Sequence, residues 1–319
     1  MNAPSSARIR WFAGDYPALQ CRRVAFSMDE RVRDMERLTI EGLHKLSGAV
    51  TVHGAKNSAL PILAATLLAD GASEITNCPA LSDVEASAAI LRYLGCRVEQ
   101  ADGCVTVDTA GLCRNDVPDR LMREMRSSIV FLGAIAARTG EAHLTFPGGC
   151  ELGPRPIDLH LSGLRTLGAE IDDAGGMLHC RAARLRGREI VLSLPSVGAT
   201  ENLMLAACGA EGTTSICNAA REPEITDLQN FLNCGARVSG AGSTTVVIEG
   251  GHKLHGCTYT VMPDRIVAGT YLCAAAAAGG TVLLQGAREQ HLATVTAVLR
   301  EAGCDIVSDS AGIACVCRR

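Results

Sequence analysis

A cysteine-bearing loop near the middle of the chain holds the residue types best suited to chemistry. The run 147–158 reads Pro-Gly-Gly-Cys-Glu-Leu-Gly-Pro-Arg-Pro-Ile-Asp, with Cys150 standing five residues before Arg155. Glycines let a backbone approach a ligand closely. A nearby guanidinium lowers the pKa of a thiol, and it also suits a phosphate or carboxylate. The pattern predicts a reactive thiol beside an anion site; the plainer interpretation is a surface turn with an incidental cysteine.

Two further cations stand where apolar helical segments begin. Lys56 precedes the apolar run 58–68, so its charge and the helix N-terminus could both meet an anion. Arg126 precedes a second apolar run, and a guanidinium is costly to bury there without a partner. Lys56 could therefore face an anionic ligand, or it could be a solvated lysine. Arg126 needs a partner, which a structural ion pair could supply.

The elements that would position these residues recur along the chain with a period of about 70 residues. In each repeat two helical segments end at a glycine, and a β-like pair follows the second. The glycines are Gly71, Gly95, Gly140, Gly168, Gly212, Gly235, Gly280 and Gly303. The second repeat is longer than the others, and its extra residues fall at the Cys150 loop. A loop added to one copy of a repeated scaffold favours a functional role over packing.

Each repeat is expected to contain strands around two helices of different character. In the first repeat we predict strands at 48–52 and 73–77, an apolar helix at 58–68, an amphipathic helix at 83–94 and two strands within 97–107. A helix that is apolar all round is typically buried, so the first helices should lie at the centre of a ring of units. The acids Asp83, Asp158 and Asp227 are expected in first turns or caps.

Composition excludes several classes of protein. A net charge of −4 and only 3% aromatic residues argue against a nucleic-acid surface. No apolar run reaches the roughly 18 residues of a membrane span. An odd count of 15 cysteines without Cys-x-x-Cys argues against a disulfide framework and a zinc ribbon, and indicates a reducing, cytoplasmic compartment. Thirteen cysteines besides Cys150 lie in or beside apolar runs and are expected in the core, with Cys315 and Cys317 in a strand.

Residues 1–34 stand apart from the repeats. They are rich in arginine and lack the long apolar segment of a secretory signal. We expect a disordered extension, or a true start at Met35; a transit peptide is the alternative.

Six short motifs occur in a fixed order and carry a resemblance to a known family. They are 54–61 (Gly-Ala-Lys-Asn-Ser-Ala-Leu-Pro), 125–129 (Met-Arg-Ser-Ser-Ile), the Cys150 loop, 196–202 (Ser-Val-Gly-Ala-Thr-Glu-Asn), 220–228 (Ala-Arg-Glu-Pro-Glu-Ile-Thr-Asp-Leu) and 263–266 (Pro-Asp-Arg-Ile). From Met35 to about Ile313 the chain resembles UDP-N-acetylglucosamine 1-carboxyvinyltransferases.

The resemblance implies a fold and an activity. The fold is an α/β, inside-out prism of two domains, each with three βαβαββ units. The activity transfers the enolpyruvyl group of phosphoenolpyruvate to the 3-hydroxyl of UDP-N-acetylglucosamine, with release of phosphate. This is the first committed step of peptidoglycan synthesis and the target of fosfomycin. The two substrates are the implied partners, with no cofactor, metal, nucleic acid or membrane span.

The resemblance also assigns site residues. Cys150 would act as general acid towards C3 of phosphoenolpyruvate, Arg155 would reach its phosphate and Lys56 would bind it. Asn57 would hold the sugar side and Arg126 would face the substrate. Two short runs would contact the nucleotide. They are Pro156, Ile157, Asp158 and Leu159 at the uridine, and Ser196, Val197 and Gly198 at the diphosphate.

We also make predictions for other residues near these motifs. Leu194 departs from the family, where a lysine is often found, so one cation towards the diphosphate is absent. His160 is expected to be a packed or capping residue. Glu222 and Glu224 would be hinge or supporting acids, or else solvated charges on a turn. Asp264 and Arg265 are expected to form a salt bridge where the chain crosses between domains.

Residues 56–262 are expected to complete one three-repeat domain, and 35–55 with 263–319 to supply about one repeat of a second. The family's chain continues past the point that matches Arg319. The resemblance places there an aspartate that takes the hydroxyl proton and an arginine that closes over the phosphate. Apolar faces of the partial domain should therefore be exposed.

Three interpretations follow: a transferase whose chain is cut short, a truncated paralogue that binds a UDP-sugar without turnover, or a different protein of the same repeat class. The last includes a transferase acting on shikimate phosphate and an RNA-end cyclase. The Cys150 loop argues against the shikimate enzyme, and the lack of a basic surface argues against RNA.

Overall fold

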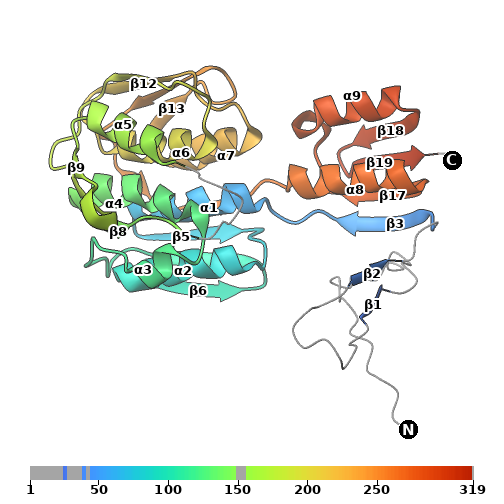
Figure 1. The fold of residues 1–319 in the computed structure, drawn as a ribbon, viewed down its shortest axis with the longest axis horizontal. Helices are drawn as coiled ribbons and strands as arrows, with labels where there is room; N and C mark the ends of the chain where they lie inside the picture. The colour runs from blue at the N-terminus through green and yellow to red at the C-terminus, as the bar shows by residue number, and fades with distance from the viewer. Residues whose placement is uncertain (1–23, 27–37, 41–43, 149–155, 318–319) are drawn as a thin grey trace, which may run out of the picture. The chain divides into compact units, whose positions relative to one another are not determined.

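The computed structural model of the protein describes residues 24–26, 38–40, 44–148 and 156–317 (Figure 1). The chain divides into two compact units, residues 54–262 and residues 1–53 with 263–319. The larger unit holds the first three repeats from residue 54 onward. The smaller unit holds the fourth repeat together with the strand that was predicted at 48–52 as part of the first. A short antiparallel pair, β1 (Val24–Phe26) and β2 (Leu38–Ile40), precedes the repeats.

Three sheets form the larger unit, one for each repeat. The first has the order β16 (Thr258–Thr260), β5 (Ala72–Thr76), β7 (Cys104–Asp108), β6 (Arg97–Ala101). The second has the order β8 (Glu141–Thr145), β10 (Met177–Arg181), β9 (Glu170–Asp172). The third has the order β11 (Glu189–Val191), β12 (Thr213–Cys217), β14 (Thr245–Glu249), β13 (Arg237–Ser239). A small parallel pair joins β4 (Ala69–Asp70) and β15 (Leu254–His255).

The sheets share one pattern of pairing. In the first and third, one parallel pair is followed by two antiparallel pairs. The second sheet has three strands, and a single parallel bridge between Asp116 and His143 of β8 occupies the corresponding place. The repeat predicted from the glycine spacing is thus confirmed at the level of backbone hydrogen bonds.

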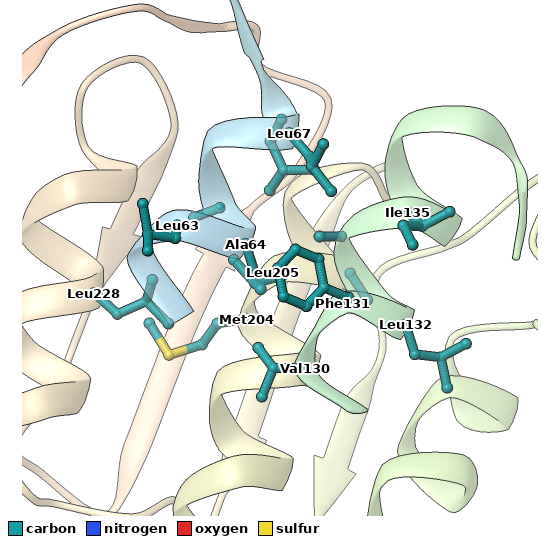
Figure 2. Packing of buried hydrophobic residues seen from close by; sticks show 14 of the residues in the cluster. Leu63, Ala64, Leu67, Val130, Phe131, Leu132, Ile135, Met204, Leu205 and Leu228 are labelled. Atoms are coloured by element: carbon teal, nitrogen blue, oxygen red, sulfur yellow. The ribbon is translucent and has the colours of Figure 1, made fainter. Parts of the chain in front are cut away.

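The first helices of the three repeats pack against one another, as their apolar composition predicts. They are α1 (Lys56–Ala65), α4 (Phe131–Thr139) and α6 (Val197–Cys208). Figure 2 shows Ala64 of α1, Phe131 of α4 and Leu205 of α6 meeting in this core. The second helices are amphipathic and bury one face. They are α2 (Ser82–Leu94), α5 (Asp158–Thr166) and α7 (Pro223–Leu232).

All eight glycines of the repeat pattern adopt positive φ. The values run from 77° at Gly140 to 149° at Gly235. Residues with a Cβ rarely adopt this conformation, whereas glycine adopts it without a steric penalty. Gly95 and Gly140 are the C-cap residues of α2 and α4, whereas Gly71 stands between β4 and β5.

The smaller unit contains one sheet and two helices. The sheet has the order β18 (Cys304–Asp309), β19 (Gly312–Cys317), β17 (Gly280–Gln285), β3 (Leu46–Thr51), and it repeats the pairing pattern of the larger unit. The helices are α8 (Arg265–Ala278) and α9 (Ala293–Glu301). Although α8 is as apolar as α6, it buries only Ala268, Leu272 and Ala275, and Ile266 is 51% exposed. Helix α8 therefore leaves part of its apolar surface exposed in the smaller unit.

Three expectations need correction. Asp227 is not a first-turn acid, because it lies in the middle of α7, where it is buried and accepts hydrogen bonds from other elements. Cys113 and Cys273 are exposed rather than in the core. The cysteine count argued against a disulfide framework, yet Cys304 and Cys317 are joined as a disulfide. Cys315 and Cys317 do lie in a strand, as predicted. No helix in the described ranges has the length and apolarity needed to cross a membrane.

Candidate active site

The residues on both sides of the Cys150 loop are well packed. Cys150 and Arg155 themselves lie outside the described residues. At the entry, the Gly148 N–H donates to the Met122 carbonyl at 3.3 Å, and a Cβ on Gly148 would lie 2.8 Å from the Cα of Arg123. At the exit, Ile157 is buried and α5 begins directly after it. Both ends of the predicted reactive loop are therefore held by the second repeat.

Arg126 lies beside the entry to this loop. It is the first residue of the 3-10 helix η2 (Arg126–Val130), which continues into α4. Its Nη1 donates to the Pro147 carbonyl oxygen at 3.2 Å. The guanidinium also acts electrostatically on His160, whose pKa it helps to lower. The predicted substrate-facing arginine thus adjoins the loop that carries the predicted thiol.

His160 is a packed histidine, as expected, and it is neutral. Burial, and then the charge of Arg126, lower its pKa to about 4, while Asp158 acts in the opposite direction. Its Nδ1 lies 3.0 Å from Nδ2 of Asn202. An amide nitrogen only donates, so Nδ1 of the neutral ring accepts and Nε2 carries the hydrogen.

Asn202 joins the helices around the site, a role that sequence reasoning missed. Its Oδ1 accepts from the Gly133 N–H at 2.7 Å, and its Nδ2 also donates to the Ile129 carbonyl at 3.2 Å. The hydrogen bond from Asn202 to His160 also links α6 to α5. The sequence signal for this role was an amide within a largely apolar helix, because buried polar groups need hydrogen-bond partners.

The N-terminus of α6 lies against His160. Ser196 caps this helix by accepting the Ala199 N–H at 3.3 Å. A Cβ on Gly198 would come within 3.4 Å of Cε1 of His160. The N–H groups at a helix start favour an anion. The diphosphate-binding residues predicted at 196–198 therefore lie beside the segment predicted to bind uridine.

Lys56 begins α1 and has a partner. Its Nζ lies 2.9 Å from Oδ2 of Asp83, which stands in the first turn of α2 as predicted. The lysine side chain is 42% exposed. Partly exposed ion pairs are weak, about 1 kcal/mol or less, so an anionic ligand can compete for the ammonium. Asn57 follows at the same helix start and is exposed.

The structure brings several of the predicted site residues together. Arg126, His160 and Gly198 gather where η2, α5 and α6 begin, with Pro156, Asp158 and Leu159 on the adjoining segment. Helix α1, which carries Lys56, packs against η2. Leu194, the departure from the family pattern, is 55% exposed.

A buried pair of acids lies in α6 and α7. Glu224 is only 2% exposed, so the alternative of a solvated turn acid is wrong for this residue. Burial first, and then the charges of Glu224 and Glu222, raise the pKa of Glu201 well above its usual value. Oε1 of Glu201 has no hydrogen-bond partner among the described residues. Asp264, expected in a salt bridge, caps α8 by accepting the Ile266 and Val267 N–H groups.

The neutral His160 predicts acid sensitivity of the fold. The unfolded histidine titrates near 6.5 and the folded one near 4, so the unfolded state binds more protons between these values. Stability from this group is complete above pH 6.5 and is lost as the pH falls towards 4. Between pH 7 and 4.5, we expect urea unfolding to show wild type losing about 2 kcal/mol more than His160→Gln. Equal losses in both proteins would contradict the assignment.

Comparison with known proteins agrees with this architecture. Residues 40–316 match the family described as EPSP synthase (3-phosphoshikimate 1-carboxyvinyltransferase). Among solved structures, the enolpyruvyl transferase NikO from Streptomyces tendae is similar with a TM-score of 0.77 at 25% identity, over 87% of this chain and 67% of that one. EPSP synthase from Acinetobacter baumannii has a TM-score of 0.67 at 22% identity, over 85% of this chain and 64% of its own, and shows the same fold.

Curated relatives define the family more closely. UDP-N-acetylglucosamine 1-carboxyvinyltransferase 2 of Caldanaerobacter subterraneus is 52% identical over 286 residues, which cover 89% of this chain and 69% of the relative. The transferase of Sorangium cellulosum is 48% identical over 273 residues, covering 85% and 65%. The chain belongs to this enolpyruvyl transferase family, and it spans about two thirds of the length of these relatives. The resemblance drawn from the six motifs is confirmed.

Proposed function

We propose that the protein acts in the transfer of the enolpyruvyl group of phosphoenolpyruvate to the 3-hydroxyl of UDP-N-acetylglucosamine, with release of phosphate. One observation supports the proposal in addition to the family membership of the chain. The starts of η2, α5 and α6 converge around Arg126, His160 and Gly198, next to the entry of the Cys150 loop. A guanidinium and helix N-termini at one place suit a substrate with several anionic groups.

The chemistry assigns a separate task to each region. The sugar hydroxyl loses its proton to the aspartate that the family resemblance implies and adds to C2 of phosphoenolpyruvate, while the Cys150 thiol gives a proton to C3. Loss of a proton from C3 then expels phosphate and restores the double bond. Lys56 and Arg155 neutralise the phosphate and carboxylate, and Arg126 faces the same substrate. A thiol suits the acid step because its pKa can be brought near neutrality.

The nucleotide is assigned to the second and third repeats. Pro156, Ile157, Asp158 and Leu159 would hold the uridine, Ser196, Val197 and Gly198 the diphosphate, and Asn57 the sugar side. Residues 56–262 would form the complete three-repeat domain, and 35–55 with 263–319 about one repeat of a second. The reaction would serve peptidoglycan synthesis in the cytoplasm, and hence cell-wall formation, cell shape and division.

A second candidate function is binding of a UDP-sugar without turnover. The residues assigned to the nucleotide all fall within the larger unit, 54–262, so this unit would hold the sugar nucleotide by itself. In this case the nucleotide would bind normally, and phosphoenolpyruvate would be left intact.

The acceptor can be identified directly. The purified chain would be incubated with phosphoenolpyruvate and either UDP-N-acetylglucosamine or shikimate 3-phosphate, and the products weighed by mass spectrometry. The proposal expects an enolpyruvyl adduct of the UDP-sugar alone. An adduct of shikimate phosphate would contradict it. Calorimetric binding of UDP-N-acetylglucosamine with no adduct of either acceptor would support the second candidate.

Leu194 offers a test of the diphosphate assignment. Replacing this exposed side chain by lysine would restore the cation that the family often carries before the 196–198 helix start. We expect Leu194→Lys to tighten binding of UDP-N-acetylglucosamine about tenfold at low salt, the scale of one charge-assisted hydrogen bond. Calorimetry would measure the change, with Leu194→Gln as the uncharged control. Equal affinity in both variants would place the diphosphate elsewhere.

A further inference from the structure

The last two strands of the chain place three cysteines on one face of a sheet. Cys304 of β18 lies directly opposite Cys317 of β19, with Cα atoms 4.7 Å apart. Cys315 lies two residues before Cys317 on the same strand. Side chains alternate along a strand, so these three share a face. All are buried, with exposures of 7% for Cys304, 0% for Cys315 and 7% for Cys317.

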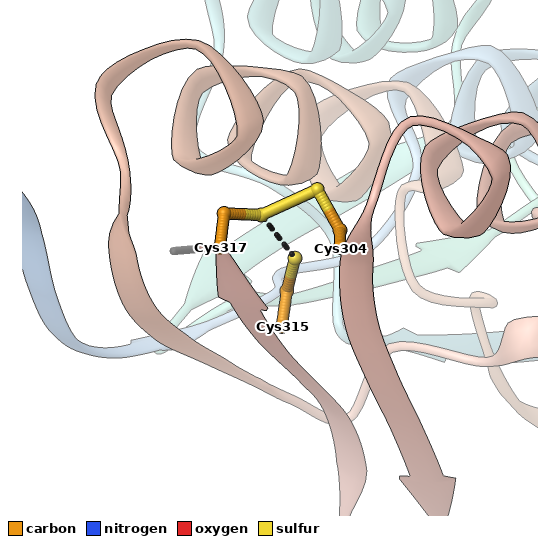
Figure 3. The surroundings of a disulfide bond; sticks show 3 residues. All are labelled: Cys304, Cys315 and Cys317. Carbon is orange, nitrogen blue, oxygen red and sulfur yellow. Dashed lines mark hydrogen bonds between the residues drawn. A yellow bond between two sulfur atoms is a disulfide. The ribbon is translucent and has the colours of Figure 1, made fainter. Parts of the chain in front are cut away.

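The three sulfur atoms form a compact group. The Sγ atoms of Cys315 and Cys317 are 3.5 Å apart, and all three lie within 4.8 Å of one another (Figure 3). A tetrahedral zinc ion with Zn–S bonds of about 2.3 Å holds neighbouring sulfurs about 3.8 Å apart. Within the described ranges, no histidine or carboxylate joins this group. The donor set is therefore all sulfur. The distance between the Sγ atoms of Cys315 and Cys317 is close to the spacing a metal requires, while Cys304 and Cys317 are bonded to each other until they are reduced.

We propose that reduced Cys304, Cys315 and Cys317 bind a thiophilic d10 cation, with zinc as the physiological candidate, through three thiolates and one position open to an external ligand. Soft thiolate donors select such ions over magnesium or calcium. The backbone register of β18 and β19 sets the donors in place before the ion arrives. The site lies in the smaller unit and does not depend on the proposed transferase activity.

Metal binding would change the protonation of the three thiols, because metal-bound thiols lose their protons. Binding of one divalent ion forms three metal–sulfur bonds and releases three protons.

The disulfide defines a second, exclusive state of the cluster. With Cys304 and Cys317 joined, only Cys315 is a thiol and the ligand set is incomplete. Reduction adds two electrons and two protons. A water-soluble phosphine can supply the electrons, becoming its oxide with oxygen from water. We therefore expect metal binding only after reduction.

Cadmium titration of the whole chain tests the proposal. The protein would be reduced with phosphine and desalted without air, and thiolate-to-cadmium charge transfer would be followed in the ultraviolet. We expect one tight equivalent in wild type, and affinity about a hundredfold weaker in Cys315→Ser, since even an indirect ligand contact costs 10- to 100-fold. Cys273→Ser removes an exposed thiol of the same unit and should match wild type. Unchanged binding in Cys315→Ser would overturn the site.

A second measurement needs no variant. Reduced wild type would be alkylated with iodoacetamide in the presence of zinc or of a chelator, and the labelled peptides quantified. Zinc should slow labelling of Cys304, Cys315 and Cys317 together by at least about tenfold, and leave Cys113 and Cys273 unaffected. Equal rates at the three cysteines with and without zinc would exclude the proposal, even if a variant failed to fold.

Discussion

Replacing Cys150 by serine is expected to abolish alkylation of the protein by fosfomycin and to lower turnover by a factor of about 10² to 10⁴. The epoxide needs a thiolate nucleophile, and a serine hydroxyl is a much weaker acid and nucleophile at neutral pH. General acid catalysis by a positioned group contributes about this range of rate. Intact-mass spectrometry would measure the adduct, and phosphate release would measure turnover.

Cys113→Ser provides the matched control, because Cys113 is an exposed thiol of the same unit with no assigned role. It should retain both the adduct and the activity. Full activity in Cys150→Ser would remove the general-acid assignment. A wild-type protein without a fosfomycin adduct, whose Cys150 still reacts with a general thiol reagent, would count against the assigned surroundings of the thiol.

Asp227→Ala is expected to cost about 3 to 5 kcal/mol of unfolding free energy. The buried carboxylate accepts the Tyr259 hydroxyl at 2.7 Å, the Met262 N–H at 3.1 Å and the hydroxyl of Ser58. Alanine would leave these buried donors without an acceptor, and each unsatisfied group costs about 1 to 3 kcal/mol. Urea unfolding of wild type and variant would measure the difference.

The control is Asp119→Ala. Asp119 forms an exposed salt bridge with Arg123 four residues along the chain, a contact worth about 0.5 kcal/mol. If Asp227→Ala destabilised the protein no more than Asp119→Ala does, the result would contradict the claim that hydrogen bonds to Asp227 stabilise the packing of α1, α7 and the segment before Met262. The same comparison tests whether Asp227 is a buried acid in the middle of α7. Removing a solvent-exposed capping acid in the first turn would lower the unfolding free energy by only about 1 kcal/mol.

Periodic features of this chain could be predicted from sequence because they depend on local rules. The positive φ at glycines such as Gly95 and Gly303 follows from how helices end. The buried inner helices follow from an apolar composition on every side. The positive-φ glycines recur in all four repeats, so each copy supports the others.

Features that depend on long-range contact could not be predicted. Asn202 meets His160 across 42 residues, and Asp227 meets Ser58 across 169, so neither partner can be read from local pattern. The pairing of Cys304 with Cys317 depends on the register of β18 against β19. Lys56 was given no protein partner, because nothing in the sequence places Asp83 beside it. The roles of Cys150 and Arg155 stay predictions, since both lie outside the described residues.

The central claim is that this chain carries out enolpyruvyl transfer to a UDP-sugar, and phosphate release tests it most directly. Purified residues 1–319 would be given phosphoenolpyruvate with and without UDP-N-acetylglucosamine, and free phosphate would be followed over time. The account predicts release that requires the sugar nucleotide and is lost in Cys150→Ser. Folded protein that binds the nucleotide yet releases no phosphate would contradict it.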